Sequence, residues 1–165
     1  AVLLAGCVGQ AGPTGPPAGS APAATTAAAP AAATGPDLVT AAYLRYWDAV
    51  RAAHRAGDPA AGGLAAVAAD PELGRVRATV ARNRAQQLSV RGEVRHEPAP
   101  PVVSGGTATI EDCYDITGWN PVDLRTGDPV GTVEAGGTGR YRVRWALRGS
   151  GESWKVVDQE ALGGC

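Results

Sequence analysis

The sequence contains no Met, no Phe and a single Lys, so nearly all of its positive charge is carried by Arg. Charge is almost balanced, with 15 Lys and Arg against 16 Asp and Glu and a formal net charge of −1. A chain without a basic excess has no field to attract nucleic acid. We therefore expect no nucleic-acid partner.

Several motifs of common enzymes are also absent. The chain has no phosphate-binding Walker loop, no G-x-G-x-x-G, no G-x-S-x-G, no H-E-x-x-H and no S-x-x-K. It also lacks C-x-x-C and any close His and Cys group, so neither a redox motif nor a zinc site is indicated. We expect no cofactor and no metal.

Charge is missing altogether from the first 36 residues. Residues 8–36 consist mainly of Ala, Gly, Thr and Ser interrupted by six prolines. Such a mixture cannot bury enough apolar surface to fold. It predicts an extended tether, with the folded domain confined to residues 37–165.

The tether follows an apolar stretch that ends in a cysteine. Leu4, Ala5, Gly6 and Cys7 resemble the lipobox of bacterial lipoprotein precursors. The resemblance implies that residues 1–6 are the end of a signal peptide whose charged start precedes Ala1. It also implies that lipid on the Cys7 thiol anchors the protein to the outer face of the cell membrane. The alternative is an incidental cysteine after an apolar stub, which is too short to span a bilayer.

Setting Cys7 aside leaves Cys113 and Cys165, an even pair in a chain expected to mature outside the reducing cytosol. A disulfide between them is the natural prediction, and it would pin the C-terminal strand to the sheet. Two unpaired thiols are the alternative.

Helical periodicity dominates the first part of the domain. Val39, Tyr43, Tyr46 and Val50 recur at three- and four-residue spacing, which predicts a helix from Asp37 to Gly57. A weaker helix is predicted over residues 58–69, loosened by two glycines. A third is predicted to open at residues 70–72 and to direct Leu73, Val76 and Val80 inward.

Beyond Gln87 apolar and polar residues alternate with a period of two, which is typical of strands. Strands are predicted over residues 88–97, over 102–116 with a turn at 104–106, and over 140–148 and 154–162. Residues 123–128 are predicted to form a hairpin turn, and 131–139 a loop. Helices followed by antiparallel strands predict an α+β domain, with the helices packed on one face of a curved sheet.

This order of elements resembles the NTF2-like superfamily, also called cystatin-like or SnoaL-like, whose sheet and first helix form a cone with a pocket. The segments Asp112-Cys113-Tyr114-Asp115, Gly118-Trp119 and Trp154-Lys155-Val156-Val157-Asp158 look like those of secreted NTF2-like proteins of high-GC Gram-positive bacteria. The likeness covers about residues 38–165. Its motifs are structural, so it implies the fold more than any activity.

If the cone holds a site, Asp112 and Asp158 are the candidate catalytic residues. Asp112 shares strand parity with Ile110, and Asp158 with Val156, so both are predicted to face inward. A carboxylate in an apolar pocket has a raised pKa and can move a proton. A β-bulge would reverse this parity, and an inward Asp is more often a structural acid.

Aromatic side chains are the candidate ligand contacts, although aromatics at helical spacing more often belong to a core. Those considered are Tyr43, Tyr46, Trp47 and Tyr114. His54 and His96 lie near the ends of predicted elements and are expected at the surface. The row Arg140, Arg142, Arg144 and Arg148 is expected to be a solvated face paired with carboxylates.

These features favour a membrane-anchored accessory or ligand-binding module over an enzyme. Its expected partners are the membrane, through the lipid anchor, and a small apolar ligand or an envelope protein. Two alternatives remain: an isomerase- or dehydratase-type enzyme that uses pocket carboxylates, and a protein-binding module of the cell envelope. The sequence does not indicate an oligomeric state.

Overall fold

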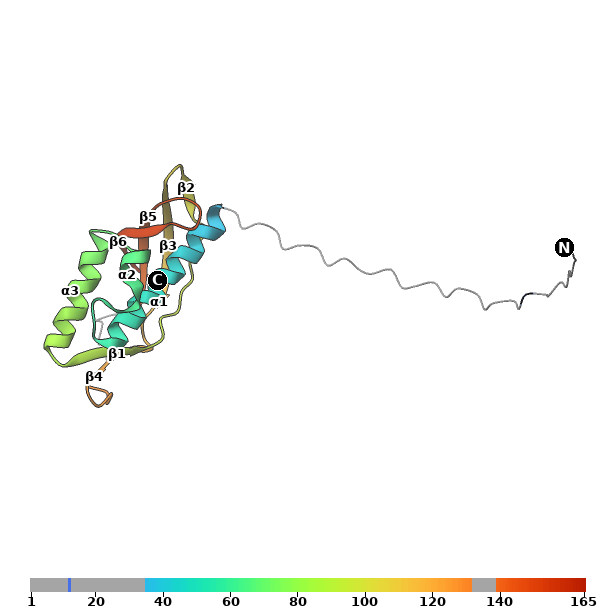
Figure 1. Cartoon of the computed structure of the whole chain (residues 1–165). Helices are drawn as coiled ribbons and strands as arrows, with labels where there is room; N and C mark the ends of the chain where they lie inside the picture. The colour runs from blue at the N-terminus through green and yellow to red at the C-terminus, as the bar shows by residue number, and fades with distance from the viewer. Residues whose placement is uncertain (1–11, 13–34, 132–138) are drawn as a thin grey trace, which may run out of the picture. The chain divides into compact units, whose positions relative to one another are not determined.

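The computed structural model describes residue 12 and residues 35–131 and 139–165, and those from Gly35 onward belong to one compact unit (Figure 1). The predictions for Cys7, the tether and most of the Gly-rich segment 131–139 lie outside the described residues. Among the described residues, three α-helices precede all of the strands and pack against antiparallel sheets. The α+β class predicted from the sequence is confirmed.

Helix α1 (Gly35–Ala56) is the longest element and carries the predicted apolar stripe. Val39, Tyr43, Tyr46 and Val50 are all at most 4% exposed. The helix stops at Gly57, whose φ of 59° is a left-handed conformation that glycine adopts without steric cost.

The weaker helix predicted over residues 58–69 is mostly absent. A short 3₁₀ turn (Ala61–Gly63) and the single-turn helix α2 (Leu64–Val67) stand in its place. Gly62 and Gly63 both have positive φ, which breaks helical continuity. Helix α3 (Glu72–Ala85) follows as predicted, with Val76 and Val80 buried.

In the part of the chain that the structure describes, six strands form two antiparallel sheets. The four-stranded sheet has the order β2 (Val102–Ser104), β3 (Thr107–Asp115), β5 (Arg140–Arg148) and β6 (Lys155–Gly164). The two-stranded sheet pairs β1 (Leu88–Gly92) with β4 (Trp119–Asp123). The predicted turn at 104–106 connects β2 to β3. The predicted turn at 123–128 follows β4.

Strand β1 is shorter than predicted and buries different residues. It ends at Gly92, whereas the strand was predicted to continue to residue 97. The following segment is joined to β3 by isolated bridges, Arg95 to Asp115 and Pro98 to Asp112, rather than by a continuous ladder. In β1, Ser89 is 1% exposed while Leu88 and Val90 are only half-buried.

A bulge in β6 changes which of its side chains face the core. Leu147 pairs with Val156 and Ala146 pairs with Asp158, so Val157 has no partner of its own on β5. Val156 and Val157 are consequently both buried. Side chains after Val157 therefore point to the face of the sheet opposite to the one predicted by strict alternation from Trp154.

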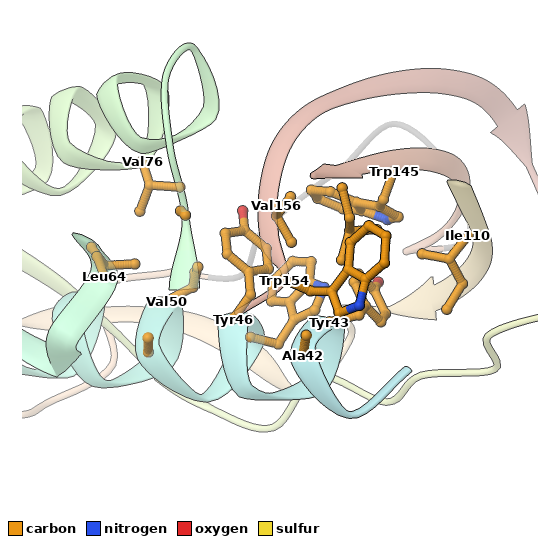
Figure 2. Packing of buried hydrophobic residues seen from close by; sticks show 14 of the residues in the cluster. Ala42, Tyr43, Tyr46, Val50, Leu64, Val76, Ile110, Trp145, Trp154 and Val156 are labelled. Atoms are coloured by element: carbon orange, nitrogen blue, oxygen red, sulfur yellow. The ribbon is translucent and has the colours of Figure 1, made fainter. Parts of the chain in front are cut away.

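The core lies between α1 and the four-stranded sheet. Figure 2 shows Tyr43 and Tyr46 of α1 packed near Trp145 of β5 and Val156 of β6. Leu64 of α2 and Val76 of α3 extend the same cluster. Among the described residues, no helix combines the length and apolar character needed to cross a bilayer.

Candidate functional site: an aromatic cleft beside two buried acids

Two adjoining cavities form a cleft between the helices and the sheet. The larger one, which we call the outer cavity, has a volume of about 760 Å³, and the smaller one, which we call the inner cavity, about 150 Å³. Arg75 of α3, Tyr114 of β3 and Gln159 of β6 line both cavities and so join them. The outer cavity is further bounded by Arg140, Tyr141, Val143, Ala161, Gly163 and Gly164.

Five of the twelve residues that line the inner cavity are Tyr or Trp. Three of the four residues proposed from the sequence as ligand contacts, Tyr46, Trp47 and Tyr114, line it. Trp119 and Trp145 complete the wall, with ring centres 6.0 Å and 5.6 Å from that of Trp47. The pKa of the Tyr114 phenol rises to about 12, mainly because it is buried.

His54 lies at the α1 side of the inner cavity and is buried, which contradicts the expected surface position. Its ring packs edge-on against Trp119, with the centres 4.9 Å apart. Burial lowers the pKa of this imidazole to about 4, so the ring is neutral at pH 7. The signal for burial was present in the sequence, since His54 follows Val50 by four residues on the apolar stripe.

Glu72 is an acidic residue of the inner cavity that sequence reasoning treated only as the start of a helix. Its side chain is 2% exposed, and burial raises its pKa. The Tyr46 hydroxyl donates a hydrogen bond to one carboxylate oxygen, and the Arg75 guanidinium donates to the other. Its spacing of four residues from Val76 on α3 could have indicated an inward position.

Asp158 does not face the core, and the prediction that it does is wrong. Its side chain is 54% exposed because the bulge at Val157 reverses the strand parity. It accepts a hydrogen bond from Arg75 at 2.9 Å, and this bond is the largest cause of its lowered pKa. Asp158 therefore contributes to the rim of the cleft by holding Arg75.

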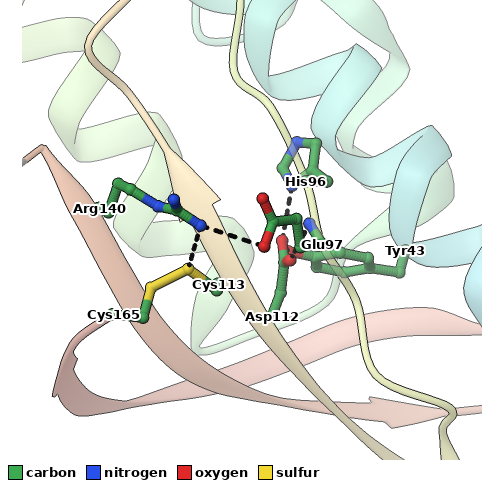
Figure 3. Close-up of a disulfide and its surroundings, with 7 residues drawn as sticks. All are labelled: Tyr43, His96, Glu97, Asp112, Cys113, Arg140 and Cys165. Atoms are coloured by element: carbon green, nitrogen blue, oxygen red, sulfur yellow. Dashed lines mark hydrogen bonds and ion pairs between the residues drawn. A yellow bond between two sulfur atoms is a disulfide. The ribbon is translucent and has the colours of Figure 1, made fainter.

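Asp112, in contrast, faces inward as predicted and is 1% exposed (Figure 3). One of its carboxylate oxygens, Oδ2, lies 2.7 Å from both the Tyr43 hydroxyl and His96 Nδ1. The other oxygen accepts the backbone N–H of Glu97 at 2.7 Å. Burial, followed by the charge of Asp112, raises the pKa of Tyr43 far above its usual range.

The pairing of His96 with Asp112 was not predicted. His96 was expected at the surface, and this expectation is wrong. Its side chain is 11% exposed because the chain after β1 folds back along β3. His96 does not line the cleft. Trp47 and Tyr114 pack against its ring at 4.9 Å and 6.4 Å and themselves line the inner cavity. The pair thus lies behind the aromatic wall.

The predicted disulfide joins Cys113 of β3 to Cys165, with the two Cα atoms 6.0 Å apart (Figure 3). The Arg140 guanidinium lies 3.2 Å from Cys113 Sγ and donates to Glu97 at 3.1 Å. Because Cys165 directly follows Gly163 and Gly164, the bridge fixes the part of β6 that lines the outer cavity.

Two of the four arginines in the row on β5 are paired with carboxylates, Arg140 with Glu97 and Arg144 with two acids. Arg144 donates to Glu111 of β3 at 2.8 Å and to Glu160 of β6 at 2.9 Å. Both partners stand opposite Arg144 in the strand register. Among the described residues, no three His, Cys, Asp or Glu side chains gather in a group that could hold a metal ion.

Comparison with known proteins gives a fold and no function. No family model and no curated protein matches the sequence. One similar solved structure is the crystal structure of the intermembrane space region of chloroplast protein ARC6, with a TM-score of 0.51 and 18% identity. That match covers 78% of this chain and 98% of the other. A second similar structure is that of a de novo designed β-sheet protein, solved by NMR, with a TM-score of 0.37 and 15% identity. That match covers 78% of this chain and 91% of the other. Only the first supports a shared fold, and identity this low carries no activity with it.

Proposed function

We propose that this domain is a non-catalytic ligand-binding module, which takes up a small, largely apolar molecule in the cleft between α3 and the sheet. The observation that carries the proposal is the aromatic-lined cleft. Its outer cavity of about 760 Å³ lies within the range typical of sites for small molecules. Aromatic walls with a few polar groups are the usual composition of such sites.

The burial and the hydrogen bonds of Glu72 and Asp112 favour ligand binding over catalysis. A general base must come within hydrogen-bond reach of the substrate proton that it removes, whereas the side chains of Glu72 and Asp112 are only 2% and 0% exposed. In the inner cavity, both oxygens of Glu72 are engaged, one by Tyr46 and the other by Arg75. Asp112 is engaged on both oxygens as well, and its His96 partner does not line the cleft. These contacts support a structural role for the two acids.

The site of action rests on the sequence before the domain. Lipid on Cys7, followed by the uncharged tether of residues 8–36, would hold the cleft at the outer face of a bacterial cell membrane. The Cys113–Cys165 disulfide is compatible with this oxidising location. Mass spectrometry of the N-terminus of the native protein tests the anchor, and an unmodified Cys7 would refute it.

Ligand binding is tested with N-phenyl-1-naphthylamine, an uncharged probe that fluoresces in apolar sites. We expect saturable binding that is lost in Ala161→Trp, because Ala161 lines the outer cavity and the indole would fill it. Thr109→Trp is the matched control, since Thr109 is exposed on β3 and lines neither cavity. Absence of saturable binding, or equal binding by both variants, would contradict the proposal.

A further inference from the structure

The disulfide joins two cysteines in unequal surroundings. Cys165 and the five residues before it are exposed, whereas Cys113 lies half-buried in β3. A disulfide is broken when a thiolate attacks one of its sulfur atoms and expels the other. An external thiol therefore reaches Cys165 more easily, and Cys113 becomes the leaving group.

The sulfur atom of Cys113 is in contact with a cation. Nη2 of Arg140 lies 3.2 Å from Cys113 Sγ and also donates to Glu97 at 3.1 Å (Figure 3). This nitrogen carries two hydrogens, so the two contacts are compatible. A guanidinium beside a sulfur atom stabilises its thiolate form, and a more stable thiolate leaves faster. The contact therefore favours cleavage of the disulfide by attack at Cys165.

Direct attack on Cys113 is less favourable. A separate cavity of about 250 Å³ reaches this residue, and its charged lining consists of Glu97, Glu111, Asp112 and Arg142. An attacking thiolate is an anion and would enter against the excess of carboxylates. Arg140, by contrast, is hydrogen-bonded to Sγ itself, so it acts most strongly on a thiolate that departs from Cys113.

Breaking the bridge would free a segment that borders the outer cavity. Gly163 and Gly164 line this cavity and come directly before Cys165. Without the bridge they are held by their pairing with Tyr141 and Arg142 at the start of β5. The end of a strand with few buried contacts opens at low cost. The redox state of the bridge therefore sets how firmly this wall is held.

We propose that the Cys113–Cys165 disulfide is a thiol–disulfide exchange site for an external dithiol, and that its reduction loosens the wall of the ligand cleft. One thiolate of the dithiol attacks Cys165 Sγ and forms a mixed disulfide, while Cys113 departs as a thiolate beside Arg140. The second thiolate of the dithiol then attacks its partner sulfur and releases Cys165. In total the dithiol is oxidised to a disulfide, and two electrons and two protons pass to the protein. The effect on the cleft rests on the proposed ligand-binding function, whereas the exchange chemistry does not.

Glutathione, a monothiol, tests which sulfur atom is attacked in the full chain. Its mixed disulfide has no second thiol to resolve it, so iodoacetamide can trap the cysteine that was released. Peptide mass mapping should find glutathione on Cys165 and the alkyl group on Cys113, and it separates both from Cys7. Glutathione found mainly on Cys113 would overturn the proposed direction of attack.

The rate of reduction by dithiothreitol tests the role of Arg140. We expect Arg140→Gln to slow the reaction at least threefold, because the departing thiolate loses a charge-assisted hydrogen bond. Arg148→Gln is the matched control, since Arg148 is exposed on the same strand and pairs with Thr107 at the far end of β3. Equal rates for the two variants would contradict the role of Arg140.

The dependence of this rate on dithiothreitol concentration is measured on the unmodified protein, so it does not require Arg140→Gln to fold. The rate should rise in proportion to the concentration. A plateau would mean that reduction waits for unfolding, and it would overturn an exchange site in the folded protein.

Titrations with N-phenyl-1-naphthylamine test the effect on the cleft. The reduced protein should stay folded and bind the probe at least threefold more weakly, and reoxidation should restore the affinity. Equal affinity in both states would overturn the effect on the cleft, and so would unfolding on reduction, since the bridge would then be purely structural. Absence of binding to the oxidised protein would instead refute the ligand-binding function, and the exchange rates would then judge the exchange site by themselves.

Discussion

The His54 ring is buried, and no carboxylate among the described residues forms an ion pair with it, so its protonation is unfavourable in the folded state. Its pKa falls from the ordinary 6.5 to about 4 through burial. Between these two values the unfolded chain binds a proton that the folded chain does not. Stability is therefore lost as the pH falls from about 6.5 to about 4, and none of this loss occurs above pH 7.

We predict that His54→Leu removes this part of the acid sensitivity. The free energy of unfolding of the unmodified protein should fall by on the order of 2–3 kcal/mol more than that of the variant between pH 7 and pH 4. Urea denaturation followed by tryptophan fluorescence at several pH values gives the difference. Parallel pH profiles for the two proteins would show that His54 is accessible to protons in the folded state.

Whether a single polar residue is buried was the hardest property to predict from the sequence. Asp112 was placed correctly because its strand is regular from Thr107 to Asp115. Asp158 was placed wrongly because one bulged residue, Val157, reversed the parity. The partners of Asp112 could not be predicted, since Tyr43 and His96 come from a helix and a loop 69 and 16 residues away.

At the scale of elements, the end of β1 depends on a close backbone contact. Gly92 has a φ of 108°, and a Cβ atom there would lie 1.9 Å from the carbonyl oxygen of Gly118. Gly92 pairs with Trp119, the first residue of β4 and part of the inner cavity wall. A side chain at this position would have to separate the two strands.

We predict that Gly92→Ala lowers the free energy of unfolding by about 3 kcal/mol, because backbone strain and a steric clash both contribute. Gly105→Ala is the control, since Gly105 also has positive φ, at 56°, but has no neighbour within 4 Å. That control should lose about 1 kcal/mol. Thermal unfolding by circular dichroism compares the two, and equal losses would show that β1 and β4 separate easily.

The elements themselves were largely predictable, because periodicity reports which face of a helix or strand is buried. The stripe of α1 and the alternation of β5 come from long, regular segments. Two of the failures fall where glycine interrupts the pattern: Gly62 and Gly63 shorten the second helix, and Gly92 ends β1 early. Backbone conformations with positive φ leave little trace in hydrophobic periodicity.

At the scale of the whole molecule, the disulfide connects the stability of the domain to the shape of its cleft. It links Cys113 in the middle of the four-stranded sheet to the C-terminal residue, across a sequence separation of 52. The residues just before Cys165 are exposed, so few packing contacts hold them in place. The bridge therefore constrains the wall formed by Gly163 and Gly164, in addition to their pairing with β5.

Replacing both cysteines by Cys113→Ser and Cys165→Ser should have two measurable consequences. The free energy of unfolding should fall by about 2–4 kcal/mol, because a long loop is no longer closed in the unfolded chain. N-phenyl-1-naphthylamine should also bind more weakly, since the end of β6 can leave the cleft. Urea denaturation measures the first effect, and a fluorescence titration under conditions where the variant stays folded measures the second. A folded variant with unchanged probe affinity would show that the strand pairing of β5 with β6 holds the wall without the bridge.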